Sequence, residues 1–131
     1  MTRKQYRILV VDDEDSVRLS LMAYLEDVGY DTYTAQSAED ALVLMESVEI
    51  NLAIIDIRLP GMNGNTLINE IHKRYPHTTF LIHTGSVFYN LPLELSDIGI
   101  RKEDILIKPI NDMQILVHAI ESVIKRGKQN D

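Results

Sequence analysis

The chain has 131 residues, of which 45% are hydrophobic and 25% charged, which is the size of one compact domain with a single core. The absence of cysteine excludes a disulfide framework, a zinc-thiolate site and a cysteine nucleophile. Thirteen Lys and Arg against twenty Asp and Glu give a net charge of −7, which repels polyanions, so no direct nucleic-acid binding is expected. No apolar run is long enough for a signal peptide or a membrane span, and we expect a cytoplasmic location.

The N-terminal part of the chain alternates short apolar runs with helical patterns. The runs 6–11 and 32–35 are rich in β-branched and aromatic residues and predict two strands. Ser16 is the expected N-cap of the helix between them, which Gly29 ends, and Ser37 is the expected N-cap of the helix that follows. Apolar residues recur at helical spacing in both helices: Val17, Leu21, Leu25 and Val28 in the first, then Ala38, Ala41, Leu42, Met45 and Val48 in the second.

Three more apolar runs predict strands in the rest of the chain, at 52–55, 79–84 and 105–107. Between the first two, a turn-forming stretch at 59–64 precedes a helix that Pro76 ends. The inward face of that helix is predicted to be Leu67, Ile68, Ile71 and Tyr75.

The segment 85–103 has no sustained helical period, so only a short helix is expected there, with Pro92 in its first turn. After the fifth strand, Asn111 or Asp112 is expected to open a last helix. Its apolar face is Met113, Leu116, Ile120, Val123 and Ile124.

Strands that alternate with helices at short spacing predict an α/β fold: a doubly wound, five-stranded parallel sheet of order 2-1-3-4-5 with helices on both faces, flavodoxin-like. In such a sheet the ligand crevice lies beyond the carboxyl ends of the strands. Asp12 and Asp13 end the first strand, Asp56 the third, Thr84 the fourth and Lys108 the fifth. We therefore expect these side chains at one edge of the sheet.

Carboxylates that close together cannot all stay ionised without a partner. A hard divalent cation such as Mg²⁺ supplies one, since it prefers carboxylate oxygens and often bridges to a phosphate. Asp56 stands alone before a Pro-Gly turn and is the better candidate for a nucleophile that forms an aspartyl phosphate, while Asp12 and Asp13 are better placed to hold the metal. Lys108 and the Thr84 hydroxyl can neutralise and bind phosphoryl oxygens.

Four motifs together resemble the receiver domain of bacterial two-component response regulators, over nearly the whole chain. They are Ile8-Leu9-Val10-Val11-Asp12-Asp13-Glu14, Ile54-Ile55-Asp56-Ile57-Arg58-Leu59-Pro60-Gly61-Met62-Asn63-Gly64, Thr84-Gly85 and Lys108-Pro109. The resemblance implies a receiver domain at 1–126 and a polar tail or the start of a linker at 127–131.

The resemblance further implies that Asp56 accepts a phosphoryl group from a histidine kinase or a phosphotransfer protein. Mg²⁺ would be bound by Asp13, Asp56 and the backbone carbonyl of Arg58, with Asp12 holding it through water. Such a domain promotes its own phosphorylation and dephosphorylation and turns over no external substrate. Arg58 and Ser86 resemble positions that tune the lifetime of the phosphoryl group.

In relatives, the residue that matches Thr84 turns toward the phosphoryl group and the one that matches Lys108 pairs with it, often before a cis proline, so Pro109 is a candidate cis residue. Two features depart from the family pattern. Ile105 stands where an aromatic residue is usual, and 85–103 lacks the usual signature of the fourth helix. The output partner, and a homodimer through the fourth-helix to fifth-helix face, therefore stay open.

A cluster within that segment, Phe88, Tyr89 and Leu91, is expected to pack rather than to form an exposed patch. The four histidines, at 72, 77, 83 and 118, are too scattered for a metal site. His83, inside an apolar strand, is expected to be a core residue with its hydrogen bonds satisfied.

Two alternatives are kept. Asp13-Glu14-Asp15 after an apolar strand resembles the nucleophile motif of haloacid-dehalogenase-type phosphohydrolases, but a further acidic pair after Lys108 is missing and Asp56 would have no role. The second alternative is a degenerate receiver that serves only as an interaction module, which Ile105 favours and the complete set of strand-end residues opposes.

Overall fold

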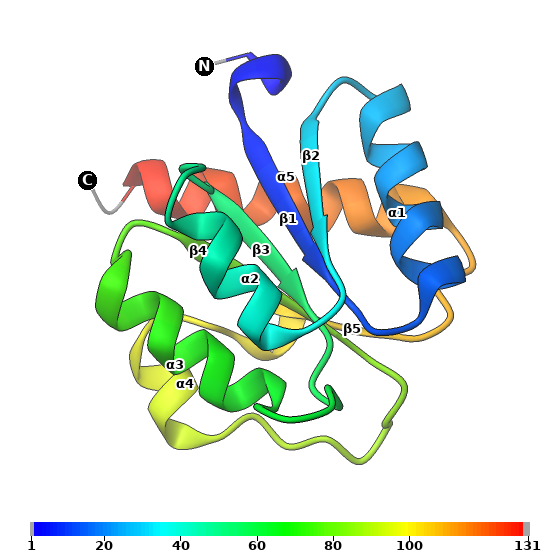
Figure 1. Cartoon of the computed structure of the whole chain (residues 1–131). Coiled ribbons are helices and arrows are strands. Elements are labelled where there is room, and N and C mark those ends of the chain that lie inside the picture. Colours follow the sequence, from blue (N-terminus) through cyan, green and yellow to red (C-terminus); the bar gives the residue numbers. More distant parts are fainter. Residues whose placement is uncertain (1, 130–131) are drawn as a thin grey trace.

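Within residues 2–129, which the computed structural model describes, five parallel strands form one sheet (Figure 1). They are β1 (Arg7–Val11), β2 (Asp31–Ala35), β3 (Leu52–Ile55), β4 (Thr79–Thr84) and β5 (Ile105–Ile107). Their order, β2-β1-β3-β4-β5, confirms the prediction. Val11 pairs with Ile55 across β1 and β3, so these two neighbouring strands end level with each other.

Helices cover both faces of the sheet (Figure 1). One face carries α1 (Asp15–Asp27) and α5 (Met113–Gln129), and the other carries α2 (Ala38–Met45), α3 (Gly64–Arg74) and α4 (Leu93–Asp97). Two short 3₁₀ turns, η1 (Arg3–Gln5) and η2 (Lys102–Asp104), precede β1 and β5. No helix among the described residues is long and apolar enough to cross a membrane.

Strands β1, β3, β4 and β5 each contribute to two apolar clusters, because successive side chains point to opposite faces, whereas β2 contributes to one of them. In β1, Leu9 and Val11 belong to the cluster under α2 and α3, whereas Ile8 and Val10 belong to the cluster under α1 and α5. We call these the first and the second core cluster. Both are closed by helices, which explains why the strands read as continuous apolar runs.

The helix ends agree with the sequence at several points. Ser37 accepts a hydrogen bond from the backbone of Asp40, Asp112 accepts one from the backbone of Gln114, and Gly29 has the left-handed φ of 102°. The Lys108-Pro109 peptide bond is cis, as the resemblance suggested.

The prediction that Ser16 caps the first helix is wrong. The helix starts two residues earlier than predicted, with Glu14 as its N-cap residue, because Asp12 Oδ1 accepts a hydrogen bond from the Glu14 backbone and already holds the turn. Pro92 likewise occupies the N-cap position of α4 rather than its first turn.

At the other end of the chain, α5 continues to Gln129, so the polar segment predicted from residue 127 begins within the helix. Residues 130–131 lie outside the described part. In the segment after β4, Tyr89 and Leu91 pack against the first core cluster as predicted, but Phe88 is 87% exposed, so the expectation was wrong for that residue.

Candidate functional site

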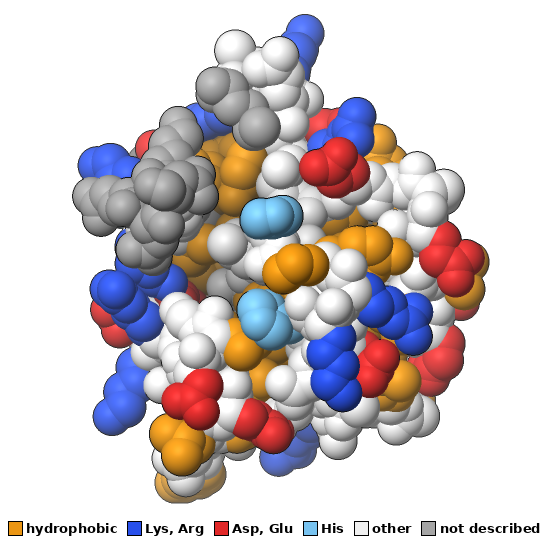
Figure 2. Space-filling model, turned by 90° about the vertical axis from the view of Figure 1, so that its left-hand side faces the viewer, with side chains coloured by type: hydrophobic (Ala, Val, Ile, Leu, Met, Phe, Trp, Pro, Cys, Tyr) orange, Lys and Arg blue, Asp and Glu red, His pale blue; other side chains and the backbone are white. Residues whose placement is uncertain are grey.

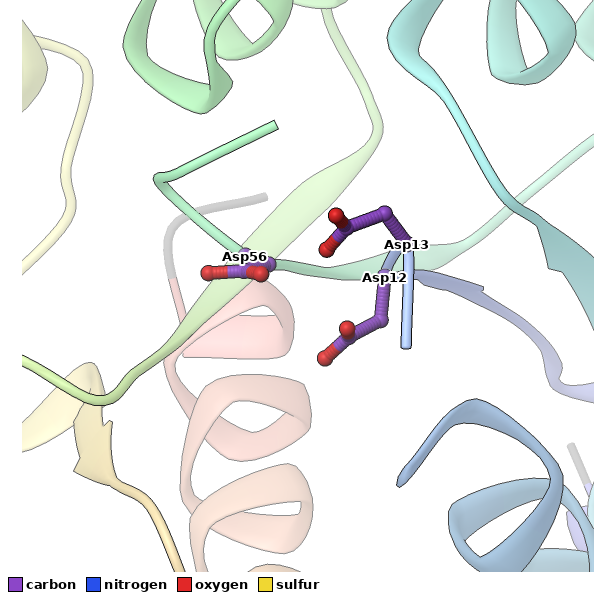
Figure 3. Close-up of side chains that lie close together, drawn as sticks. All are labelled: Asp12, Asp13 and Asp56. Carbon is purple, nitrogen blue, oxygen red and sulfur yellow. The ribbon is translucent and has the colours of Figure 1, made fainter. Parts of the chain in front are cut away.

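Three carboxylates come together where β1 and β3 end (Figure 3). Each of Asp12, Asp13 and Asp56 offers an oxygen that lies within 4.8 Å of the others'. Asp12 and Asp56 are 1% and 5% exposed, whereas Asp13 faces solvent. The arrangement follows from the topology, since β1 and β3 are adjacent and end level with each other.

Among the residues that the structure describes, Lys108 is the lysine that contacts this cluster. Lys108 Nζ lies 2.8 Å from Asp12 Oδ2 and 3.3 Å from Asp56 Oδ2, and it also lies 3.3 Å from Glu14 Oε1. Three ionised aspartates and one ammonium sum to a charge of −2, which a divalent cation would neutralise.

Burial and charge act on the proton equilibria of this cluster. Burial raises the pKa of Asp56, the charge of Lys108 works against that rise, and the charge of Asp12 adds to it. Burial alone would lower the pKa of Lys108, but the close contact with the charged Asp12, helped by Asp56, outweighs burial and raises it. The lysine is therefore charged at neutral pH.

The donor set fits a hard cation. Asp12 Oδ2 is buried and has no hydrogen-bond partner within residues 2–129, since its contact with Lys108 Nζ meets the distance of an ion pair but not the angles of a hydrogen bond. A buried carboxylate oxygen left in that state is unfavourable unless a cation or water meets it. Oxygen ligands of this kind are those that Mg²⁺ prefers.

The other predicted residues lie at the same edge of the sheet. Thr84 ends β4, is 1% exposed, and its Oγ1 accepts a hydrogen bond of 3.2 Å from the backbone of Ser86. The backbone of Arg58 donates to Asp56 Oδ1 at 3.3 Å. The backbone of Lys108 donates to the Thr84 carbonyl at 2.8 Å, which ties the start of the last loop to β4.

Two residues that were not predicted from the sequence as part of the site fix the backbone near its carboxylates. Arg18 donates to the backbone carbonyl of Asp12 at 2.9 Å and pairs with Asp15 at 2.6 Å, so it clamps the turn that carries the first two carboxylates. Gly64 starts α3 against the backbone of Asp56, where an added Cβ would lie 2.3 Å from the carbonyl oxygen. A glycine at the first position of a helix was the one available signal of this close approach.

The structure corrects the expectation for His83. The side chain is buried, at 4% exposure, but among residues 2–129 neither ring nitrogen has a hydrogen-bond partner. Burial, and after it the charge of Lys108, lowers the pKa of His83 to about 4. The ring is therefore neutral at physiological pH.

A parallel sheet of this order, with an acidic cluster and a lysine at its carboxyl edge, defines a doubly wound α/β domain with a candidate cation site in its crevice. Residues 8–121 match the response regulator receiver domain family, and the chain belongs to that family. It is thus a receiver domain of two-component response regulators, a family whose members interact with histidine kinases and output domains and are in general not substrate-turning enzymes.

Relatives and solved structures agree with this assignment. The transcriptional regulatory protein AruR of Pseudomonas aeruginosa is 34% identical over 127 residues, which are 92% of this chain and 50% of AruR. A receiver domain structure from Clostridium thermocellum has a TM-score of 0.82 at 30% identity and covers 96% of this chain and 99% of that one. The response regulator TrrA of Thermotoga maritima, solved in complex with Mg(2+)-BeF, has a TM-score of 0.78 at 30% identity and covers 90% of this chain and 98% of that one.

The chain spans about half the length of the curated relatives that it matches along most of its own length. Neither alternative function is favoured. Asp15, the second acid of the hydrolase motif, pairs with Arg18, whereas Asp56, which that motif leaves without a role, joins the acidic cluster.

Proposed function

We propose that Asp56 is the phosphoacceptor of this receiver, that Asp12 and Asp13 form the metal site with it, and that Lys108 and Thr84 bind the phosphoryl group. The observation that carries the proposal is the meeting of three carboxylate oxygens within 4.8 Å, with the one lysine ammonium 3.3 Å from Asp56. TrrA, a similar protein, is solved with Mg(2+)-BeF.

The transfer makes one bond and breaks one bond. An oxygen of the Asp56 carboxylate attacks phosphorus, and the bond from phosphorus to the donor breaks, with its electron pair leaving on the donor atom. For a phosphohistidine of a kinase or phosphotransfer protein, that atom is an imidazole nitrogen. Burial of Asp56 supports this role, because the carboxylate is poorly hydrated and ready to react.

Lys108 and Thr84 would bind the negatively charged oxygens of the transferred phosphoryl group. Lys108 Nζ already touches Asp56 Oδ2, so it can follow the new phosphoryl oxygens without leaving the site. Thr84 lies at the end of the neighbouring strand, and its hydroxyl can donate to one of those oxygens while accepting from Ser86.

Mg²⁺ is the cation that we propose for this site. Asp13 and Asp56 would bind it directly with the backbone carbonyl of Arg58, and Asp12 would bind it through water. When bound, the ion supplies positive charge against the phosphoryl oxygens. Asp12 Oδ2, which is buried and pairs with Lys108 but accepts no hydrogen bond within the described residues, supports a further cation here.

We propose a histidine kinase or a phosphotransfer protein as donor, in the cytoplasm, and an output partner or output domain as receiver of the signal. Exposed apolar side chains on α4, β5 and α5 support docking of that partner, or of a second copy, on this face: Leu93, Ile107 and Ile115. Direct nucleic-acid binding is not proposed, and on the face in Figure 2 acidic and basic side chains are interspersed. We propose that the receiver ends near residue 126, with a polar tail or the start of a linker at 127–131, into which α5 continues as far as Gln129.

The test is incubation with acetyl phosphate and Mg²⁺, followed by intact-mass measurement. The wild-type chain should gain one phosphoryl group, Asp56→Asn should gain none, and Asp97→Asn, which changes an exposed acid of α4, should behave as wild type. Asp13→Asn should need more Mg²⁺ for the same yield. An adduct that survives in Asp56→Asn and disappears in Asp13→Asn would show that Asp13 is the nucleophile instead.

A further inference from the structure

A cleft lies beside the acidic cluster, between the first turns of α1 and the loop from β5 to α5, with a volume of about 530 Å³. Its walls are apolar: Val17 and Leu21 from α1, and Ile110 and Met113 on the opposite side. These side chains belong to the second core cluster or pack against it, so the cleft is a part of that core that the helices leave uncovered. Its size and apolar lining are typical of sites for small molecules.

His83 lines this cleft from β4, and its imidazole ring is the side chain on which hydrogen bonding in the cleft would depend. Neither ring nitrogen has a hydrogen-bond partner within the described residues, and a buried polar group in that state is unfavourable. The neutral ring has one nitrogen that accepts a hydrogen bond and one that donates. A molecule in the cleft can satisfy this unmet capacity after a small turn of the ring.

The charges at the rim indicate what kind of molecule fits. Glu14 and Lys108 both line the cleft, and their side chains pair with each other at 3.3 Å. Lys108 also pairs with Asp12 and Asp56, so the rim carries more negative than positive charge and disfavours an anion, while the apolar walls disfavour any charged group.

We infer that this cleft, lined by Val17, Leu21, His83, Ile110 and Met113, binds a small uncharged molecule with an apolar ring and an N–H or O–H donor, whose hydrogen bond the imidazole of His83 accepts. The site is separate from the phosphoacceptor, but Lys108 lines both. Occupancy of the cleft therefore changes the rate of phosphorylation, and only this link rests on the proposed function.

The test uses two probes of the same shape, indole and indene, of which only indole has an N–H donor. Titration of the full chain, followed by NMR, should give saturable shifts of the His83 ring and of the amides around the cleft with indole. Indene should bind about five- to tenfold more weakly, which is the effect of one hydrogen bond. Phosphorylation by acetyl phosphate, with and without saturating indole, measures the link.

Three variants complete the design. His83→Leu should bind indole no better than indene. Ser20→Trp fills the cleft from an exposed position and should abolish binding of both probes, whereas Ser122→Trp places the same side chain on an exposed position of α5 outside the cleft and should leave it unchanged.

Equal affinity for indole and indene would refute the role of His83. Shifts that map elsewhere, or binding that Ser20→Trp leaves intact, would refute the site. An unchanged phosphorylation rate at saturating indole would refute the link alone, whereas a wild-type chain that gains no phosphoryl group without indole would refute the proposed function and not the cleft.

Discussion

Replacing Gly64 by alanine tests how α3 positions the proposed phosphoacceptor. The new Cβ would lie 2.3 Å from the backbone oxygen of Asp56 and 2.7 Å from the Cα of Ile57, far inside van der Waals contact. Both are backbone atoms of the segment that follows β3, so no side-chain rotation can relieve the overlap. Either the start of α3 or the Asp56 segment has to move.

The expected loss of stability is about 2–3 kcal/mol, the upper part of the range for overpacking, because the neighbours are rigid. For a domain of this size that corresponds to a fall in melting temperature of about 8–12 °C. Mg²⁺ binding should weaken as well, since the movement displaces one of its three carboxylates.

Urea unfolding gives the change in stability, and a Mg²⁺ titration gives the change in affinity. Gly127→Ala is the matched control, because no atom lies within 4 Å of its added Cβ and its place in α5 predicts a gain of up to about 1 kcal/mol. The two substitutions therefore have opposite expected signs. A Gly64→Ala chain within about 0.5 kcal/mol of wild type, with unchanged Mg²⁺ affinity, would refute this reasoning.

Three further perturbations give distinct results. Arg18→Met should weaken Mg²⁺ binding about three- to tenfold in a calorimetric titration, because the carbonyl of Asp12 loses its clamp. Arg126→Met should lower the free energy of unfolding by about 3–5 kcal/mol in urea, because it leaves Asp104 buried at 1% exposure without its cation. The unfolded chain protonates His83 near pH 6.5 and the folded chain only near pH 4, so stability present above pH 6.5 should fall by up to about 3 kcal/mol as the pH drops to 4, and His83→Leu should remove this fall.

Exposed ion pairs provide the controls. Arg7→Met breaks a half-exposed pair at the start of β1 and should leave Mg²⁺ binding unchanged. Arg74→Met breaks an exposed pair within α3 and should change stability by less than about 1 kcal/mol. If Arg126→Met has no larger effect than Arg74→Met, the buried pair does not have the assigned strength. A stability difference between wild type and His83→Leu that stays constant from pH 4 to 7 would contradict the pH prediction.

Local patterns in the sequence determined the strands and the residues at their ends, and the doubly wound fold class that they indicate supplied the strand order. Apolar runs bounded by polar residues identify buried strands, and a parallel sheet brings their carboxyl ends to one edge. This is why the sequence alone predicts that Asp12, Asp13 and Asp56 lie together, as they do in the structure. The same reasoning failed at Ser16, because the side chain of Asp12 competes with it for the start of α1.

Other features depend on packing between segments far apart in the chain. The pair of Asp104 and Arg126 and the cleft beside His83 have no local signature, and the approach of Gly64 to the Asp56 backbone is signalled only by a glycine at the start of a helix. Hydrophobic periodicity is set by each element's own geometry and can be read along the chain. Which charge meets which partner, and which polar atom is left without one, is decided only when the layers close, because those distances depend on how the helices lie across the sheet.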